Sequence, residues 1–139
     1  MNLEQVKTLV TSCIEEMNAR YRKVVFDEWA IVSLAGGKPR VLAYSGPRKE
    51  GFLKNFAADA KSLREGLLAK DYNVGDFEFA RQSVGTGFES FLVLGSGVYL
   101  ICNNTVQTMD GIAQDPRWLS AQVPFVELSD KVRANAVVA

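Results

Sequence analysis

The sequence predicts a single α+β domain: a five-stranded antiparallel sheet with helices on both faces, in the element order α-β-β-α-β-β-β-α. Three observations predict this class. Residues 77–104 contain three short segments of strand-forming residues separated by glycines, and residues 29–45 contain two more. Residues 2–20 and 47–70 repeat apolar residues at helical spacing. No linker or repeat separates these segments, so we expect all 139 residues to form one domain.

The first helix is expected over residues 2–20, where apolar residues recur every three or four positions. Asn2 and Gln5 have the spacing of a capping box at its start. Residues 29–45 then predict a hairpin, because two apolar strand-like runs flank a pair of glycines. The intervening residues 21–28 fit either the end of the helix or the beginning of the first strand.

The second helix is expected over residues 47–70, with Pro47 in its first turn, where the missing N–H costs nothing. Its apolar residues span an arc of about 160°, against the ~100° that a surface helix usually buries. Two explanations are open. The helix lies deep under a loop, or part of the arc packs on the sheet and the rest meets a second subunit. We favour the subunit interface, because most oligomers of this size are symmetric dimers.

Three strands are expected between residues 77 and 104. Phe77 and Phe79 point to one side and Glu78 to the other, which is typical of a strand with one buried face. Residues 91–94 and 98–102 are apolar at every position, which indicates strands covered on both faces. The connections are too short for crossovers, so the strands should be antiparallel neighbours.

The last third of the chain is expected to be helical with interruptions. Thr105 or Thr108 can cap a helix that follows the strands. Pro116 and Pro124 should each interrupt helical structure, because proline removes a backbone donor and clashes with the preceding turn. Residues 134–139 have no charged side chain and are expected to be frayed.

Composition excludes several classes of function. Lys and Arg number 16, as do Asp and Glu, and this balance argues against a general nucleic-acid or membrane-surface binder. No apolar run approaches the ~20 residues of a membrane span, and the N-terminus does not resemble a secretory signal. Cys13 and Cys102 lie inside apolar patterns, so we expect buried free thiols in a cytoplasmic protein rather than a disulfide.

No motif for catalysis, cofactor binding or metal binding is present. The chain has no histidine, and its two cysteines are too far apart for the usual zinc spacing. The Gly85–Gly87 pair lacks the third glycine of a dinucleotide fingerprint, and Gly36–Gly37 lacks the context of a phosphate loop. We therefore predict no catalytic residue, no cofactor and no metal site, and the expected class is not an enzyme.

Isolated polar and aromatic residues are assigned ordinary structural roles. Asp27, Glu28 and Asp110 are expected on the solvated surface. Trp29 and Trp118 are expected in the core rather than in a ligand pocket.

The element order over residues 2–115 resembles the roadblock/LC7 family, which has a profilin-like fold. The resemblance implies a non-enzymatic regulatory or scaffold module that forms homodimers, and members act on small GTPases. In such proteins the helix after the first hairpin pairs with its mate, and an edge strand joins two sheets. The corresponding residues here are Phe52, Phe56, Leu63, Leu67, Phe77 and Phe79.

This chain departs from the family in two places. Residues 116–139 form a C-terminal helical extension beyond the usual last helix, and residues 21–28 lengthen the approach to the first strand. Either segment could cover the surface through which members bind their partners. The alternative function is a small-molecule sensor domain of profilin-, PAS- or GAF-like architecture, suggested by aromatic residues near the sheet such as Trp29, Tyr44 and Tyr99.

Overall fold

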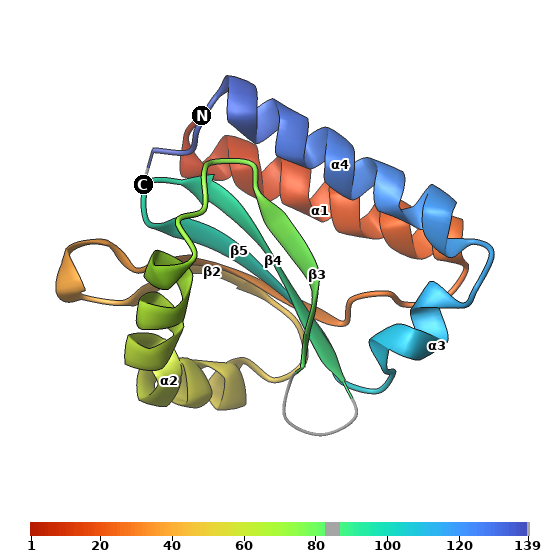
Figure 1. Ribbon diagram of the computed structural model, residues 1–139, viewed down its shortest axis with the longest axis horizontal. Helices are drawn as coiled ribbons and strands as arrows, with labels where there is room; N and C mark the ends of the chain where they lie inside the picture. The colour runs from red at the N-terminus through yellow and green to blue at the C-terminus, as the bar shows by residue number, and fades with distance from the viewer. Residues whose placement is uncertain (83–86, 139) are drawn as a thin grey trace.

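The computed structural model describes residues 1–82 and 87–138 and shows an α+β fold (Figure 1). Its elements are α1 (Leu3–Tyr21), β1 (Glu28–Ser33), a short 3₁₀ turn (Ala35–Gly37), β2 (Arg40–Ser45), α2 (Lys49–Ala69), β3 (Phe77–Gln82), β4 (Phe88–Gly95), β5 (Val98–Asn104), α3 (Met109–Ala113) and α4 (Trp118–Ala134). The predicted fold class and element order are confirmed. The glycine turn expected at 85–87 lies partly outside the described residues.

The five strands form one sheet in the order β2-β1-β5-β4-β3, and every neighbouring pair is antiparallel. The central strand β5 pairs with β1 without a register shift, with Ile31 opposite Leu100. Gly97 lies in the tight turn between β4 and β5 at φ 70°, and a Cβ there would come within 2.9 Å of the Ala35 side chain. Glycine is therefore required at this turn.

Helices α1 and α4 lie side by side on one face of the sheet (Figure 1). The larger core cluster lies beneath them, and its fully buried side chains include Met17, Ile31, Leu92, Leu100 and Phe125. Leu92 and Leu94 of β4 belong to this cluster. This side of the sheet has a deep and continuous core.

Helix α2 lies on the other face (Figure 1), where Tyr72 of the following loop also packs against Phe91. The smaller core cluster on this face includes Phe91 and Val93 of β4 and Ile101 of β5. Because neighbouring residues of β4 enter different clusters, the prediction that this strand is covered on both faces is confirmed.

The open question over residues 21–28 is settled by the end of α1. The helix stops at Tyr21, and Arg22 adopts a left-handed conformation with φ 62°. The Asn18 side-chain oxygen accepts a hydrogen bond from the backbone N–H of Val25 at 2.8 Å. Val25 and Phe26 are buried in the core as an irregular segment. Residues 22–27 therefore neither extend the helix nor belong to β1.

The predicted helix break at Pro124 is wrong, because Pro124 lies inside α4. A proline at this position leaves the carbonyl of Ser120, four residues earlier, without its helical donor. The Arg20 guanidinium of α1 donates a hydrogen bond to that carbonyl at 3.2 Å. The neighbouring helix therefore supplies the donor that proline lacks.

The predicted fraying of residues 134–139 is wrong for residues 136–138. The backbone N–H of Val137 donates to the carbonyl of Leu94 at 2.9 Å, and its side chain is 4% exposed. The N–H of Val138 donates to the carbonyl of Met1, whose own ammonium group donates to Ala136. The end of the chain is thus held against β4 and the N-terminus.

Candidate functional site

Of the four α-helices that the structure describes, α2 has the smallest share of buried residues. Of its 21 residues only Ala60 and Leu67 are buried. Phe52, Phe56 and Leu63 are half-buried against the smaller core cluster. Leu53 is 38% exposed and Leu68 is 63% exposed. The wide apolar arc predicted for this helix therefore packs only partly on its own sheet.

The six residues predicted at a dimer interface lie in two places. Phe77 and Phe79 of β3 pack under α4, with ring centroids 5.3 Å and 4.8 Å from Phe125. Phe79 also contacts Trp118 at 5.2 Å between centroids. The four residues of α2 lie on the opposite face of the sheet. Because β3 lies at the edge of the sheet, a second copy could pair with its outer backbone groups, whereas the Phe77 and Phe79 rings pack under α4.

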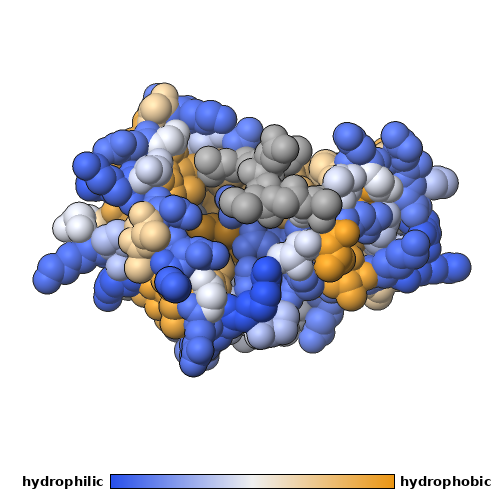
Figure 2. All heavy atoms as spheres, turned by 90° about the horizontal axis from the view of Figure 1, so that it is seen from below, coloured by the Kyte–Doolittle hydropathy of each residue, from blue (hydrophilic) through white to orange (hydrophobic). Residues whose placement is uncertain are grey.

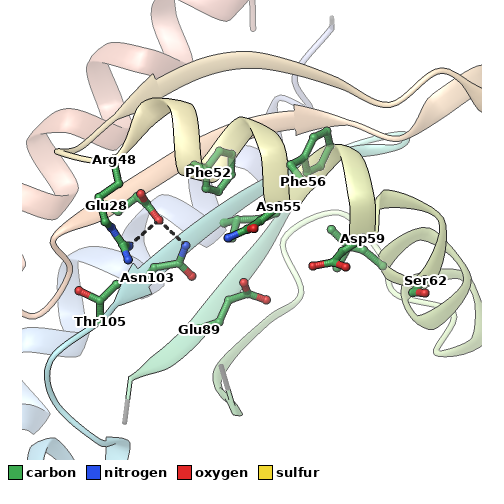
Figure 3. Close-up of a pocket in the computed structure, with 13 residues that line it drawn as sticks. Glu28, Arg48, Phe52, Asn55, Phe56, Asp59, Ser62, Glu89, Asn103 and Thr105 are labelled. Carbon is green, nitrogen blue, oxygen red and sulfur yellow. Dashed lines mark hydrogen bonds and ion pairs between the residues drawn. The ribbon is translucent and has the colours of Figure 1, made fainter. Parts of the chain in front are cut away.

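A groove of about 540 Å³ runs between α2 and the sheet (Figure 3). Its lining comes from β1, α2 and the residue before it, β4, β5 and the start of the following loop. The lining residues are Glu28, Arg48, Gly51, Phe52, Asn55, Phe56, Asp59, Ser62, Leu63, Glu89, Ile101, Asn103 and Thr105. The molecule seen from below has apolar surface in separate patches among hydrophilic residues (Figure 2).

Glu28 forms one end of the groove, and its expected place on the solvated surface is wrong. The residue is 3% exposed, and its carboxylate accepts hydrogen bonds from Arg48 at 3.1 Å and Asn103 at 2.8 Å. The Tyr44 hydroxyl donates to the other oxygen at 2.5 Å. Burial, followed by this hydrogen bond, raises the pKa of Tyr44. A buried carboxylate persists here because three donors satisfy it.

The two long walls of the groove carry polar side chains (Figure 3). Asn55, Asp59 and Ser62 follow one another at helical spacing along α2. Glu89 of β4 lies on the opposite wall. Asp59 is exposed and makes neither a hydrogen bond nor an ion pair within the part of the chain that the structure describes. Glu89, by contrast, already interacts with another group of the protein.

Two buried acceptors near this end of the groove have no donor among the described residues, Asp27 Oδ1 and Asn103 Oδ1. The other oxygen of Asp27 accepts a hydrogen bond from the Thr105 hydroxyl. Asp27 is half-buried, so the expectation of a fully solvated residue is wrong for it as well. These two oxygens are therefore free to accept a hydrogen bond from a group outside the described residues.

The remaining residues singled out from the sequence lie in the core. Trp29 and Trp118 are each 8% exposed and belong to the cluster beneath α1 and α4, as expected. Cys13 and Cys102 are free and buried, as expected. Burial raises the pKa of the Cys13 thiol to about 12 and raises that of Cys102 well above its ordinary value.

The groove could not be assembled from sequence patterns. Its end wall joins Glu28 to partners 16, 20 and 75 residues away, at Tyr44, Arg48 and Asn103. One sequence signal was available: Glu28 directly precedes a buried apolar strand, where a carboxylate needs hydrogen-bond partners.

No protein-family model, curated protein or solved structure matches this chain. Within residues 1–82 and 87–138, no group of three His, Cys, Asp or Glu residues could hold a metal ion. No helix in the same residues has both the length and the apolar composition that a membrane span requires.

Proposed function

We propose that this protein is a non-enzymatic regulatory or scaffold module that forms a homodimer through α2 and acts on a small GTPase. The observation that supports the dimer is the incomplete burial of α2, which leaves Leu53 and Leu68 exposed and three more apolar side chains half-buried. A helix with this much exposed apolar surface, beside a groove, presents a face that a second copy of the same helix can cover.

The free edge of β3 supports the same proposal. Within residues 1–82 and 87–138, this strand is paired on its β4 side and has no neighbour on the other. Its outer backbone groups can pair with the equivalent strand of another copy and extend the sheet. The GTPase is proposed from the resemblance to the roadblock/LC7 family alone.

Light scattering on the purified protein at about tens of micromolar tests the dimer, because such interfaces bind in the micromolar range or tighter. We expect twice the mass of one chain. Leu68→Asp should yield monomers, since it places a charge in the proposed interface without disturbing the core. Phe56→Asp should do the same, with circular dichroism as the check that it folds.

Leu119→Asp is the matched control, because Leu119 is 71% exposed on α4, on the opposite face of the sheet. It should remain dimeric. A monomeric wild-type protein would remove the dimer from the proposal. Small GTPases of the same organism, loaded with GDP or a GTP analogue, test the partner. If no GTPase binds in either nucleotide state, the GTPase part of the proposal is wrong, and the dimer part is unaffected.

The groove favours a second candidate function, the binding of a small molecule. Its volume of about 540 Å³ lies within the usual range for ligand sites. A thermal-shift screen of metabolite-like compounds tests this function. Asn55→Trp should fill the groove from α2 and abolish every shift that arises there. Hits that stabilise this variant as much as the wild type would count against the groove.

A further inference from the structure

The two halves of α2 differ in how they are attached to the sheet. The buried residues of this helix, Ala60 and Leu67, belong to its second half (residues 60–69). The first half (residues 49–59), all of which the structure describes, contains no buried residue, and Phe52 and Phe56 are only half-buried. Because stability against local opening follows buried apolar contact, the first half should open more easily than the second.

Two glycines lower the stability of α2 without a packing reason. Gly51 and Gly66 lie inside the helix, where glycine is less favourable than alanine because it loses more conformational freedom on folding. Outside the adjoining backbone, a Cβ at either position would meet no atom of the described residues within 4 Å. Neither glycine is therefore required by a close approach, and each weakens the half of the helix that contains it.

The start of α2 is attached to the sheet through the residue that precedes it, Arg48. Among the described residues, this N-cap residue makes no side-chain capping bond to its own helix. Its backbone N–H donates to the Tyr44 hydroxyl at 3.0 Å, and its guanidinium donates to Glu28 at 3.1 Å (Figure 3). The Tyr44 hydroxyl in turn donates to Glu28 at 2.5 Å. Polar contacts therefore hold the end of the helix that has no buried side chain.

The first half of α2 also forms most of the wall that this helix contributes to the groove. Phe52, Asn55 and Phe56 are among its lining residues, whereas the second half contributes Ser62 and Leu63. If the first half opened while the second half stayed packed on the sheet, this wall would be removed. The groove would then widen without unfolding of the whole helix.

We propose that the first half of α2 is a gate over the groove, which opens by local unfolding and is held closed by Arg48 on the Tyr44–Glu28 pair. The second half stays on the sheet when the gate opens. This proposal is independent of the proposed function, because it concerns the attachment of α2 to the sheet of its own chain.

Hydrogen exchange of the ¹⁵N-labelled protein, followed amide by amide, tests the gate. The amides compared lie beyond the first turn, because the first amides of any helix lack an acceptor within the helix. We expect the first half of α2 to exchange about tenfold or more faster than the second half, after correction for intrinsic rates. Equal rates in the two halves would mean that α2 opens as one unit and would overturn the proposal.

Gly51→Ala and Gly66→Ala are a matched pair, because they make the same change at open positions of the same helix. Gly51→Ala stabilises the closed gate and should slow exchange in the first half by about two- to fivefold. Gly66→Ala adds stability whether the gate is open or closed, so exchange in the first half should not change. Equal slowing of the first half by both variants would contradict separate opening of the two halves.

Tyr44→Phe and Tyr72→Phe are the second pair, because each removes a hydroxyl that donates to a glutamate, Glu28 or Glu78, and keeps the ring. Tyr44→Phe also leaves the N–H of Arg48 without its acceptor, so exchange in the first half should become about fivefold faster or more. Tyr72→Phe acts beyond the other end of α2 and should leave these amides unchanged.

The second half of α2 is the internal reference for Tyr44→Phe and should keep its exchange rates. Equal acceleration in both halves would show a general loss of stability, and no acceleration in either would show that the hydroxyl does not hold the gate. Either result would overturn the proposed role of the Tyr44–Glu28 pair.

The same measurements in the Leu68→Asp background separate the gate from the proposed dimer. A second copy over α2 would itself slow exchange in this helix, and this substitution is expected to remove it. We expect the difference between the two halves to persist in the monomer. A difference that disappears there would be caused by contact between subunits, and the gate would then be ruled out.

Discussion

Glu28 shows how one residue can join four segments of a chain. Its carboxylate lies at the beginning of β1 and is bound by side chains from β2, from the residue before α2 and from β5. Arg48 is 50% exposed, so its contribution is weakened by solvent, whereas the carboxylate itself is 3% exposed. If the carboxylate is replaced, the free energy lost is mainly that of the buried donors that no longer have an acceptor.

Glu28→Gln should lower the free energy of unfolding by about 1–3 kcal/mol, because one donor must then face an amide N–H₂ group and the charge-assisted bonds are lost. Urea denaturation measures this change. Glu65→Gln, at an exposed position of α2, is the control and should change stability by less than about 0.5 kcal/mol. A loss of that small size for Glu28→Gln would mean that the three hydrogen bonds contribute little.

Cys13 links burial to pH. Burial raises the pKa of its thiol from 9.0 to about 12 in the folded protein. Between these values the unfolded chain loses the proton while the folded chain keeps it, so stability is fully present below about pH 9 and falls as the pH rises.

The wild-type protein should therefore lose roughly 1 kcal/mol more stability between about pH 8.5 and 10 than Cys13→Ala does. Urea denaturation at the two pH values measures both losses. The comparison is between slopes with pH, so the cavity left by the alanine does not enter. Equal losses in the two proteins would show that the thiol titrates normally in the folded state.

At the scale of the element, α4 shows why a local rule can fail. Pro124 alone predicts a break, yet the helix continues because Arg20 donates to the Ser120 carbonyl from α1. The two helices lie along each other, so the missing intrahelical bond is replaced by one between helices (Figure 1). The helix thus depends on its neighbour at this turn.

Arg20→Met should cost about 1 kcal/mol in the wild-type chain, from the lost hydrogen bond to Ser120 together with the ion pair to Glu16. In a Pro124→Ala background the new N–H can serve the same carbonyl, so the cost should be smaller. Urea denaturation of the four proteins gives the coupling energy. A coupling of zero would contradict the proposed replacement of one donor by the other.

Elements with a strong period were predicted correctly, and features that depend on distant partners were not. The alternation around Phe77 and the capping box at Asn2 are local patterns, and the structure contains both β3 and α1 with that cap. Glu28 and Pro124 were assigned by local rules that tertiary contacts override. The ordered C-terminus follows from bonds of Val137 and Val138 to Leu94 and Met1, which no local pattern indicates.

The candidate site was predicted in part. The excess apolar surface of α2 follows from its helical spacing, and the exposure of Leu68 agrees with it. The groove does not follow, because it depends on where α2 lies across the sheet. Side-chain period specifies which residues share a face of a helix, but not how far that helix lies from each strand.

At the scale of the whole molecule, the two faces of the sheet differ in cover. Two packed helices and the larger core cluster lie on one face, whereas α2 and the smaller cluster lie on the other. Local stability follows buried apolar contact, so the amides of α2 should open more easily than those of α1 and α4. Binding at the surface of α2 should therefore change the hydrogen-exchange rates of this helix more than those of α1 and α4.

Hydrogen exchange at two concentrations should therefore detect the dimer in α2. Raising the protein from about 5 to about 200 micromolar, across the micromolar range of such interfaces, should slow exchange in α2. Exchange in α1 and α4 should not change, because each already packs against the other and the core. The Leu68→Asp variant should show no dependence on concentration. Exchange in the wild-type α2 that is equal at both concentrations would mean that no second copy covers this helix.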